Sequence, residues 1–231
     1  MRVNSNGRLW PALTAITGLG VLGVTAMFKA LPAVEAAGAC KTDGAVIRFE
    51  LATRMADLDA IFGAPGCQAK VIAAMDAVNH LDIAAYIPTY TAFCICAAIW
   101  LGGRPRAPLV LAAVALALVA FAADMVETTG LLRMTRDLAA AEPLLSRVST
   151  AAWIKFGALA LNALMLALIC LRATPRRLLL GGLLVLPVVG TTLAWLDHSR
   201  LDLMTLGFAL SWTPTMLLAI RETVWPRKVQ E

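Results

Sequence analysis

Residues 107–123 read APLVLAAVALALVAFAA, a run that contains no charged or hydrogen-bonding side chain. Comparable, mostly apolar runs lie at 9–31, 83–101, 148–171, 178–196 and 203–220. Inside lipid, each backbone N–H and C=O group must be paired within its own segment, so apolar runs of this length must be helical. The alternating polarity of a transmembrane β-strand is absent from residues 109–119. We therefore predict an all-α fold, a bundle of six transmembrane helices.

The composition supports the same class. Of the 231 residues, 60% are hydrophobic and 15% are charged, whereas soluble domains carry about 45–50% apolar and about 25% charged residues. The formal net charge of +5 does not indicate a nucleic-acid partner, because the Lys and Arg residues lie between apolar runs and form no basic face or tail. We expect the lipid bilayer as a partner, with other membrane subunits as further candidates and no nucleic acid.

The positions of Lys and Arg predict how the chain is oriented. Basic residues fall in both terminal segments and in the links after the second and fourth runs: Arg2, Arg8, Arg104, Arg106, Arg172, Arg176, Arg177, Arg221, Arg227 and Lys228. Cytoplasmic loops carry an excess of Lys and Arg. We therefore expect a bacterial inner (cytoplasmic) membrane protein with both termini in the cytoplasm. The first run also resembles a cleaved signal peptide, but its length favours a true span.

Residues 32–81 form the one sizeable extramembrane segment of this single transmembrane domain, which covers 1–231. Apolar residues recur there at steps of three and four, which predicts a short amphipathic extracytoplasmic helix that caps the bundle: Ile47, Leu51, Met55, Leu58 and Phe62. Cys40 and Cys67 flank this helix on the oxidising side of the membrane. They form either a disulfide or two free thiols.

Polar and ionisable side chains gather near the predicted outer ends of the runs. Such groups are costly in hydrocarbon and usually face the bundle interior or water. Helical spacing places several of them on shared faces of the second, third and fourth runs. The predicted binding or structural polar cluster consists of Asp82, Tyr86, Tyr90, Asp124, Glu127, Lys155 and Asn162.

Lys155 lies about two turns into the fourth run and needs an acidic partner unless it reaches the interface. Asp124 is the first choice of partner, followed by Glu127 and Asp82. Two interpretations remain open. Either a structural ion pair fixes how the helices pack, or the same residues line a binding or proton-handling site.

Four short motifs in about residues 46–165 resemble a pattern found in uncharacterised bacterial multi-pass membrane proteins: Phe49-Glu-Leu-Ala52, Asp82-x-x-x-Tyr86, Ala123-Asp-x-Val-Glu127 and Ala152-Trp-Ile-Lys155. The resemblance implies that Glu50 and the ionisable residues of the cluster belong to one constellation. The pattern has Asn where this chain has Thr128. No biochemical function follows from this resemblance.

The sequence contains no nucleophile elbow, no zinc-protease motif and no phosphate-binding glycine loop. No metal site is predicted, because His80 and His198 are the two histidines and interface histidines usually face water, and no cofactor is indicated. The leading hypothesis is a non-catalytic inner-membrane protein, either an accessory subunit of a membrane complex or a lipid or hydrophobe binder with an outer-leaflet polar cluster. The alternatives are a small transporter or permease with a periplasm-facing vestibule, and a membrane enzyme that acts on a lipid headgroup through Asp124 or Glu127.

Overall fold

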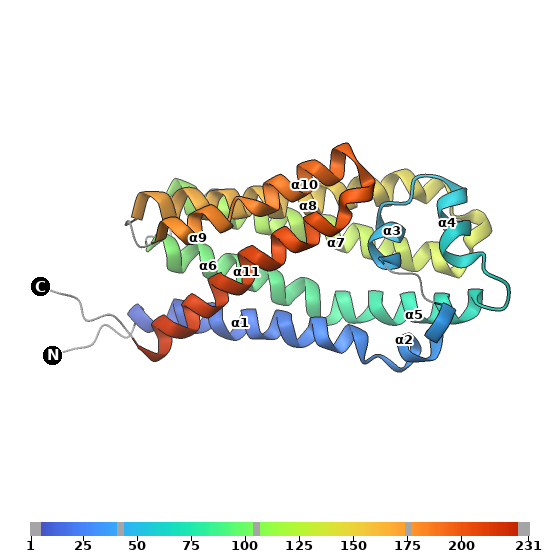
Figure 1. The fold of residues 1–231 in the computed structure, drawn as a ribbon, viewed down its shortest axis with the longest axis horizontal. Helices are drawn as coiled ribbons and strands as arrows, with labels where there is room; N and C mark the ends of the chain where they lie inside the picture. Colours follow the sequence, from blue (N-terminus) through green and yellow to red (C-terminus); the bar gives the residue numbers. More distant parts are fainter. Residues whose placement is uncertain (1–5, 41–43, 104–106, 174–176, 226–231) are drawn as a thin grey trace, which may run out of the picture. The chain divides into compact units, whose positions relative to one another are not determined.

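The computed structural model describes residues 6–40, 44–103, 107–173 and 177–225, and every regular element in these ranges is helical (Figure 1). Six helices are long and apolar enough to cross a membrane: Arg8–Cys40, Gln68–Gly102, Pro108–Arg136, Glu142–Arg172, Leu178–Leu196 and His198–Val224. The predicted all-α bundle with six membrane-spanning helices is confirmed. Some of the basic residues that predict the orientation lie outside the described residues: Arg2, Arg104, Arg106, Arg176, Arg227 and Lys228.

The helices follow one another with short connections. In chain order they are α1 (Asn6–Lys29), α2 (Pro32–Ala37), η1 (Gly38–Cys40), α3 (Ala45–Glu50), α4 (Met55–Phe62), α5 (Gln68–Leu81), η2 (Asp82–Tyr86), α6 (Ile87–Gly102), α7 (Pro108–Arg136), η3 (Leu138–Ala140), α8 (Glu142–Ala173), α9 (Leu178–Leu183), α10 (Leu186–Leu196), η5 (His198–Arg200) and α11 (Leu201–Val224). Among these, η2 is a π-helical turn, whereas η1, η3 and η5 are 3-10 turns.

The chain divides into two compact units. Unit 1 comprises Met1–Val21, Thr89–Ala120 and Phe156–Glu231, and unit 2 comprises Leu22–Pro88 and Phe121–Lys155. The segment 32–81, which the sequence sets apart as a cap, belongs to unit 2 together with parts of α1, α7 and α8.

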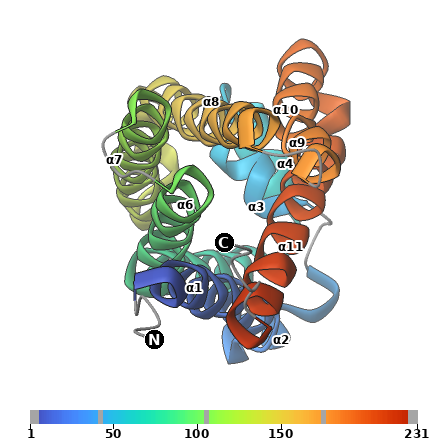
Figure 2. The same ribbon diagram turned by 90° about the vertical axis from the view of Figure 1, so that its left-hand side faces the viewer.

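Small side chains form much of the core of unit 1. Fully buried alanines from α6, α7, α8 and α11 meet there: Ala97, Ala98, Ala113, Ala163, Ala167 and Ala219. Figure 2 shows these helices end-on, with α6 beside α1 and α7. Because lipid tails are as apolar as leucine, close van der Waals packing across small residues is what holds such helices together.

The hairpin of α10 and α11 in unit 1 is closely packed (Figure 1). A methyl group placed on Gly190 would lie 2.5 Å from the carbonyl oxygen of Leu203, and one on Gly207 would lie 2.8 Å from the carbonyl oxygen of Leu186. Both neighbours are backbone atoms, which cannot rotate away as the end of a flexible side chain can. The two glycines therefore set how near the two helices lie.

We predict that Gly190→Ala destabilises the protein by about 1–3 kcal/mol, the usual penalty for forcing an extra methyl into a packed core. The melting temperature of the purified protein in detergent measures this. Gly182→Ala is the matched control, because a methyl group there meets no atom within 4 Å. Equal melting temperatures for the two variants would show that the hairpin accepts a wider spacing.

The expected amphipathic helix is interrupted in the structure. Residues 51–54 separate α3 from α4, so the chain forms two short helices where the spacing predicts one. The break has a local cause: the Asp57 carboxylate accepts hydrogen bonds from the backbone N–H groups of Thr53 and Arg54, at 3.0 Å each, and so caps the start of α4. Although Asp57 is slightly desolvated, which raises its pKa, these hydrogen bonds dominate and the pKa of Asp57 is lowered.

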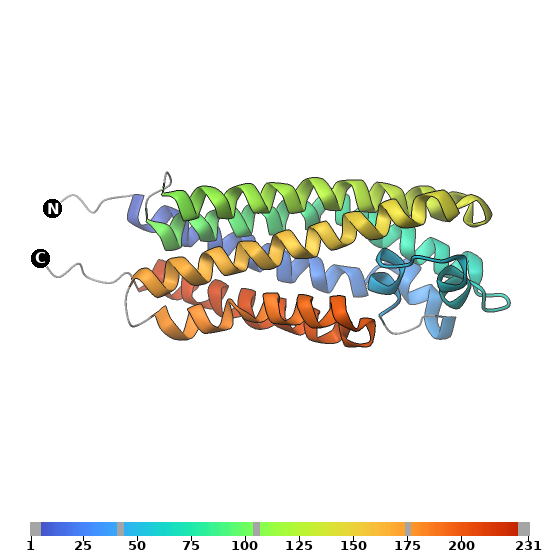
Figure 3. The same ribbon diagram turned by 90° about the horizontal axis from the view of Figure 1, so that it is seen from above.

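The apolar pattern of this segment still faces a core. Phe49, Leu58 and Phe62 are almost fully buried in unit 2, where they pack with residues of α5, α7 and α8. The rings of Phe49 and Phe62 meet edge to face at a centroid distance of 5.0 Å. Along the chain α3 contacts α4 and α4 contacts α5, and Figure 3 shows these three helices in the same part of the view. The cap is thus attached to unit 2 by a hydrophobic core of its own.

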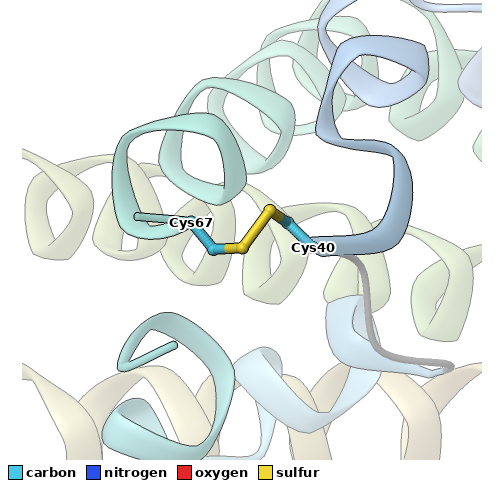
Figure 4. The surroundings of a disulfide bond; sticks show 2 residues. All are labelled: Cys40 and Cys67. Atoms are coloured by element: carbon cyan, nitrogen blue, oxygen red, sulfur yellow. A yellow bond between two sulfur atoms is a disulfide. The ribbon is translucent and has the colours of Figure 1, made fainter. Parts of the chain in front are cut away.

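A disulfide joins Cys40 and Cys67, so the alternative of two free thiols does not apply (Figure 4). The bond links the end of η1 to the residue before α5, 27 positions later. Next to it, α2 packs along α5 (Figure 1). The loop closed by the disulfide contains α3 and α4, and with them Glu50.

Candidate functional site: a buried carboxylate cluster around Lys155

Lys155 of α8 makes three ion pairs inside unit 2. Its Nζ atom lies 2.7 Å from Glu127 Oε1, 3.1 Å from Glu50 Oε2 and 3.4 Å from Asp124 Oδ1. The Lys155 side chain is 7% exposed and the Glu127 side chain is 1% exposed. An ammonium group buried this deeply is held by carboxylates from two other helices, α3 and α7.

A fourth carboxylate, that of Asp82, joins the group through a threonine. The Thr128 hydroxyl lies 3.1 Å from Asp82 Oδ2 and 3.3 Å from Asp124 Oδ1, and it donates its one proton to either oxygen. Asp82 opens η2 and is partly exposed, whereas Asp124 and Thr128 are buried. We call Glu50, Asp82, Asp124, Glu127 and Lys155 the Lys155 cluster.

Local sequence explains why α7 supplies three of these side chains. Asp124, Glu127 and Thr128 are spaced by three and four residues, so they share one face of the helix. Gly130 lies close to this face, and a methyl group on it would come within 2.5 Å of Val148 Cγ2 on α8. The absence of a side chain there lets α7 and α8 approach closely, which places Lys155 within reach of the carboxylates.

The charges of the Lys155 cluster do not balance. Four carboxylates against one ammonium give a net charge of −3 when every group is ionised. Taking ions out of water has an effective penalty of several kcal/mol per ion, which an ion pair offsets only where the geometry and hydrogen bonding are good. Lys155 pairs with three of the acids, and the Oε2 atom of Glu127 is buried without a hydrogen-bond partner. The cluster therefore has acceptor capacity that its own side chains do not use.

Glu50 is the member of the Lys155 cluster that lies outside the membrane-spanning helices. Burial raises its pKa, the neighbouring ammonium of Lys155 lowers it, and the negative charge of Asp124 raises it again. The net result is a pKa above the ordinary value for a glutamate. The Glu50 carboxyl group therefore holds a proton more firmly than an exposed glutamate does.

Tyr86 lies at the end of η2, near the Lys155 cluster. Its ring meets that of Phe28 edge to face at a centroid distance of 5.4 Å, and its hydroxyl group hydrogen-bonds with Thr25 on α1. The π-helical turn from Asp82 to Tyr86 adds a residue to the helical repeat. Side chains beyond this turn are consequently rotated relative to those before it, so Asp82 and Tyr90 do not share one continuous helix face as regular helical spacing predicts.

Tyr90 and Asn162 belong to unit 1, and the described contacts of both are made there. The Tyr90 ring stacks on Trp212 at a centroid distance of 6.1 Å, and the Asn162 amide donates a 2.7 Å hydrogen bond to the backbone carbonyl of Ala113. A buried amide that reaches a backbone carbonyl fixes helix packing. The structure therefore brings together Asp82, Asp124, Glu127 and Lys155 from the predicted list, with Tyr86 nearby.

Glu50 is the partner that spacing along a helix did not reveal, because it comes from the cap and lies 105 residues before Lys155. The resemblance of the Phe49-Glu-Leu-Ala52 motif was the signal that pointed to it. Thr128 was also missed as a link between Asp82 and Asp124. Elsewhere in unit 2, the Thr135 hydroxyl donates a hydrogen bond to Asp76 Oδ1 at 2.6 Å.

Within the described part of the chain, no three His, Cys, Asp or Glu side chains are arranged to hold a metal ion. His80 Nδ1 lies 2.7 Å from the backbone carbonyl of Asp76, one turn earlier in α5, and His198 lies in η5 of unit 1. No family model, curated protein or solved structure matches this chain.

Proposed function

We propose that this chain is a non-catalytic multi-pass membrane protein whose Lys155 cluster reversibly binds protons. The observation that carries the proposal is the surplus of buried carboxylates around one ammonium, at distances of 2.7, 3.1 and 3.4 Å from Lys155 Nζ. A protein of this kind fits an accessory subunit of a membrane complex or a binder of lipid.

Proton uptake is the simplest way to remove the surplus charge. A carboxyl group that takes up a proton loses its charge and becomes a hydrogen-bond donor. Leaving the same group ionised and unpaired would cost several kcal/mol. Because about 1.4 kcal/mol shifts a protonation equilibrium tenfold, this cost favours the protonated form of the group. The charged and titratable groups that face one another are Glu50 from α3, Asp82 and Tyr86 from η2, Asp124 and Glu127 from α7, and Lys155 from α8.

The positions of the acids along their helices support an outer location for the Lys155 cluster. Asp82 opens its span and Lys155 lies near the start of its own apolar run, on the side away from the basic links. With both termini in the cytoplasm of a bacterium, which the basic residues of the termini and links favour, the Lys155 cluster lies close to the periplasmic surface of the inner membrane. Protons from that side reach it at Glu50 and Asp82, its two partly exposed carboxylates.

Infrared spectroscopy of the purified protein tests the proposal. We expect a C=O stretching band from protonated carboxyl groups at neutral pH, a shift of this band in deuterated water, and a weaker band in Glu127→Gln. Asp59→Asn is the matched control, because Asp59 is an exposed acid on α4 of the same unit and should leave the band unchanged. A wild-type spectrum without this band at neutral pH would refute proton binding.

The pH dependence of stability provides a second readout. Between the ordinary pKa of a glutamate and the raised pKa of Glu50, the folded chain holds a proton that the unfolded chain has released. The free energy of unfolding contributed by Glu50 is therefore greatest at low pH and falls as pH rises through that window. We expect Glu50→Gln to flatten this decline in a series of thermal melts.

A further inference from the structure

We propose that one end of unit 1 binds the headgroups of anionic glycerophospholipids through exposed arginines on α1, α8 and α11. We call these residues the arginine face: Arg8, Arg172 and Arg221. The inference goes beyond the proposed function and does not depend on it, because every member of the Lys155 cluster belongs to unit 2. It assigns a partner to a different surface of the molecule.

A single hydrophobic core brings the three arginine-bearing helix ends together. Residues within two positions of each arginine belong to this core of unit 1 or pack against it: Trp10, Cys170 and Ile220. Figures 1 and 3 show the start of α1 and the end of α11 at the same end of the ribbon. The three arginine side chains are nevertheless exposed, so they lie at the surface around a shared core.

The acid that the structure describes at this end is engaged with other residues. The Trp100 indole N–H donates to Glu222 Oε2 at 3.1 Å, and Arg177 Nη2 lies 3.8 Å from the same oxygen. Arg177 also donates to the backbone carbonyl of Leu101 at 3.1 Å. Glu222 and Arg177 thus offset each other's charge. Among the described residues, no ion pair joins the arginine face to an acid.

The depth of these arginines in a bilayer follows from the spans. Arg8 begins the first membrane-spanning helix, Arg172 ends the fourth, and Arg221 precedes the end of the sixth by one turn. The ends of helices that cross the hydrocarbon core lie at the level of the lipid headgroups. Trp225, which follows α11, is 71% exposed, and tryptophan is typical of this level.

Charge and depth together favour one kind of partner. The planar guanidinium group binds phosphate oxygens through two parallel hydrogen bonds, and its apolar stem can remain in the hydrocarbon while its charge reaches the headgroup. A positive surface at this depth is complementary to lipids that carry a net negative charge, such as phosphatidylglycerol. A soluble acidic partner would match the charge but would not lie at the level of the headgroups. The arginine face therefore fits an anionic headgroup.

Two tryptophans of unit 1 provide a readout that contains its own reference. Trp225 lies at the end of α11, four residues after Arg221, whereas Trp195 lies where α10 meets the start of α11 and is 60% exposed. Bromine atoms on acyl chains quench the fluorescence of tryptophans that they contact. The experiment uses the full chain in phosphatidylcholine nanodiscs that contain a fixed fraction of brominated phosphatidylglycerol or of brominated phosphatidylcholine.

We expect brominated phosphatidylglycerol to quench the wild-type protein more strongly than brominated phosphatidylcholine does. The excess should diminish as salt is added, because salt screens exposed charges. It should fall in Trp225→Phe and be unchanged in Trp195→Phe. Arg221→Gln should weaken the preference for phosphatidylglycerol by about fivefold, the contribution of one arginine at an anionic surface.

Replacing the whole arginine face by glutamine should remove the preference. The matched control carries the same loss of charge at exposed positions of unit 2 and should retain the preference: Arg133→Gln, Arg136→Gln and Arg147→Gln. Both variants are compared after they elute and melt like the wild type. Loss of the preference in the control as well would overturn the assignment to the arginine face.

The wild-type comparison is decisive even where a variant does not fold. Equal quenching by the two brominated lipids would overturn the proposal. Inorganic pyrophosphate is added as a soluble anion in a parallel titration. If pyrophosphate binds while phosphatidylglycerol is not preferred, the surface recognises a soluble anion and the lipid assignment is wrong. None of these outcomes changes the carboxyl band by which proton binding is tested.

Discussion

Lys155→Met is expected to be the most damaging substitution in the chain, with a loss of about 3–5 kcal/mol of stability. The ammonium group is the positive charge that Glu50, Asp124 and Glu127 share. Methionine is similar in length but removes that charge, so three buried carboxyl groups lose their ion pair at once. Because folded domains are stable by only about 5–15 kcal/mol, we expect most of the variant to be lost during purification.

Size-exclusion chromatography and thermal melting in detergent measure this effect. Lys70→Met is the matched control, since Lys70 is an exposed lysine on α5 of the same unit and its removal should change stability by no more than about 0.5 kcal/mol. The pair Lys155→Met and Glu127→Gln should be less damaging than the sum of the two single changes, because each removes the partner of the other. If the stability loss of the double variant equals the sum of the two single losses, the 2.7 Å contact between Lys155 and Glu127 contributes little to stability.

Removal of the disulfide should have the second-largest effect. Cys40→Ser opens a loop of 27 residues, and the chain-entropy model assigns about 3–4 kcal/mol to a closure of this length. The loss arises mainly because the unfolded chain gains freedom. We expect a lower melting temperature for Cys40→Ser, and a similar decrease when the wild-type protein is reduced.

Cys96→Ser is the control for this prediction, because Cys96 is a free, partly buried cysteine on α6. The opened loop carries α3, and with it Glu50, so hydrogen exchange in α3 and α4 should accelerate more than in α7 or α8. If Cys40→Ser melts like Cys96→Ser, the hydrophobic contacts of Phe49 and Phe62 alone hold the cap. The disulfide would then be dispensable for stability.

The six spans and their helical class follow from the sequence alone, because lipid allows few ways to pair a backbone and a run such as 107–123 leaves only the helix. The same physics made Asp82, Asp124, Glu127 and Lys155 recognisable as a group, since ionisable side chains are rare inside apolar runs. Spacing on one helix also predicted correctly that Asp124 and Glu127 share a face.

The tertiary structure decided which of these groups meet. Glu50 reaches Lys155 across 105 residues, and no periodicity within one helix can report such a contact. Regular helical spacing predicts that Tyr90 and Asn162 share faces with cluster residues, yet their described contacts lie in unit 1. For Asn162 the reason is that a helix face is long enough to serve two different surroundings along its length. The π-helical turn at Asp82–Tyr86 changed the register that a regular helix would have kept. A sequence reports the period and polarity of each helix, whereas the pairing of side chains between helices depends on how those helices pack.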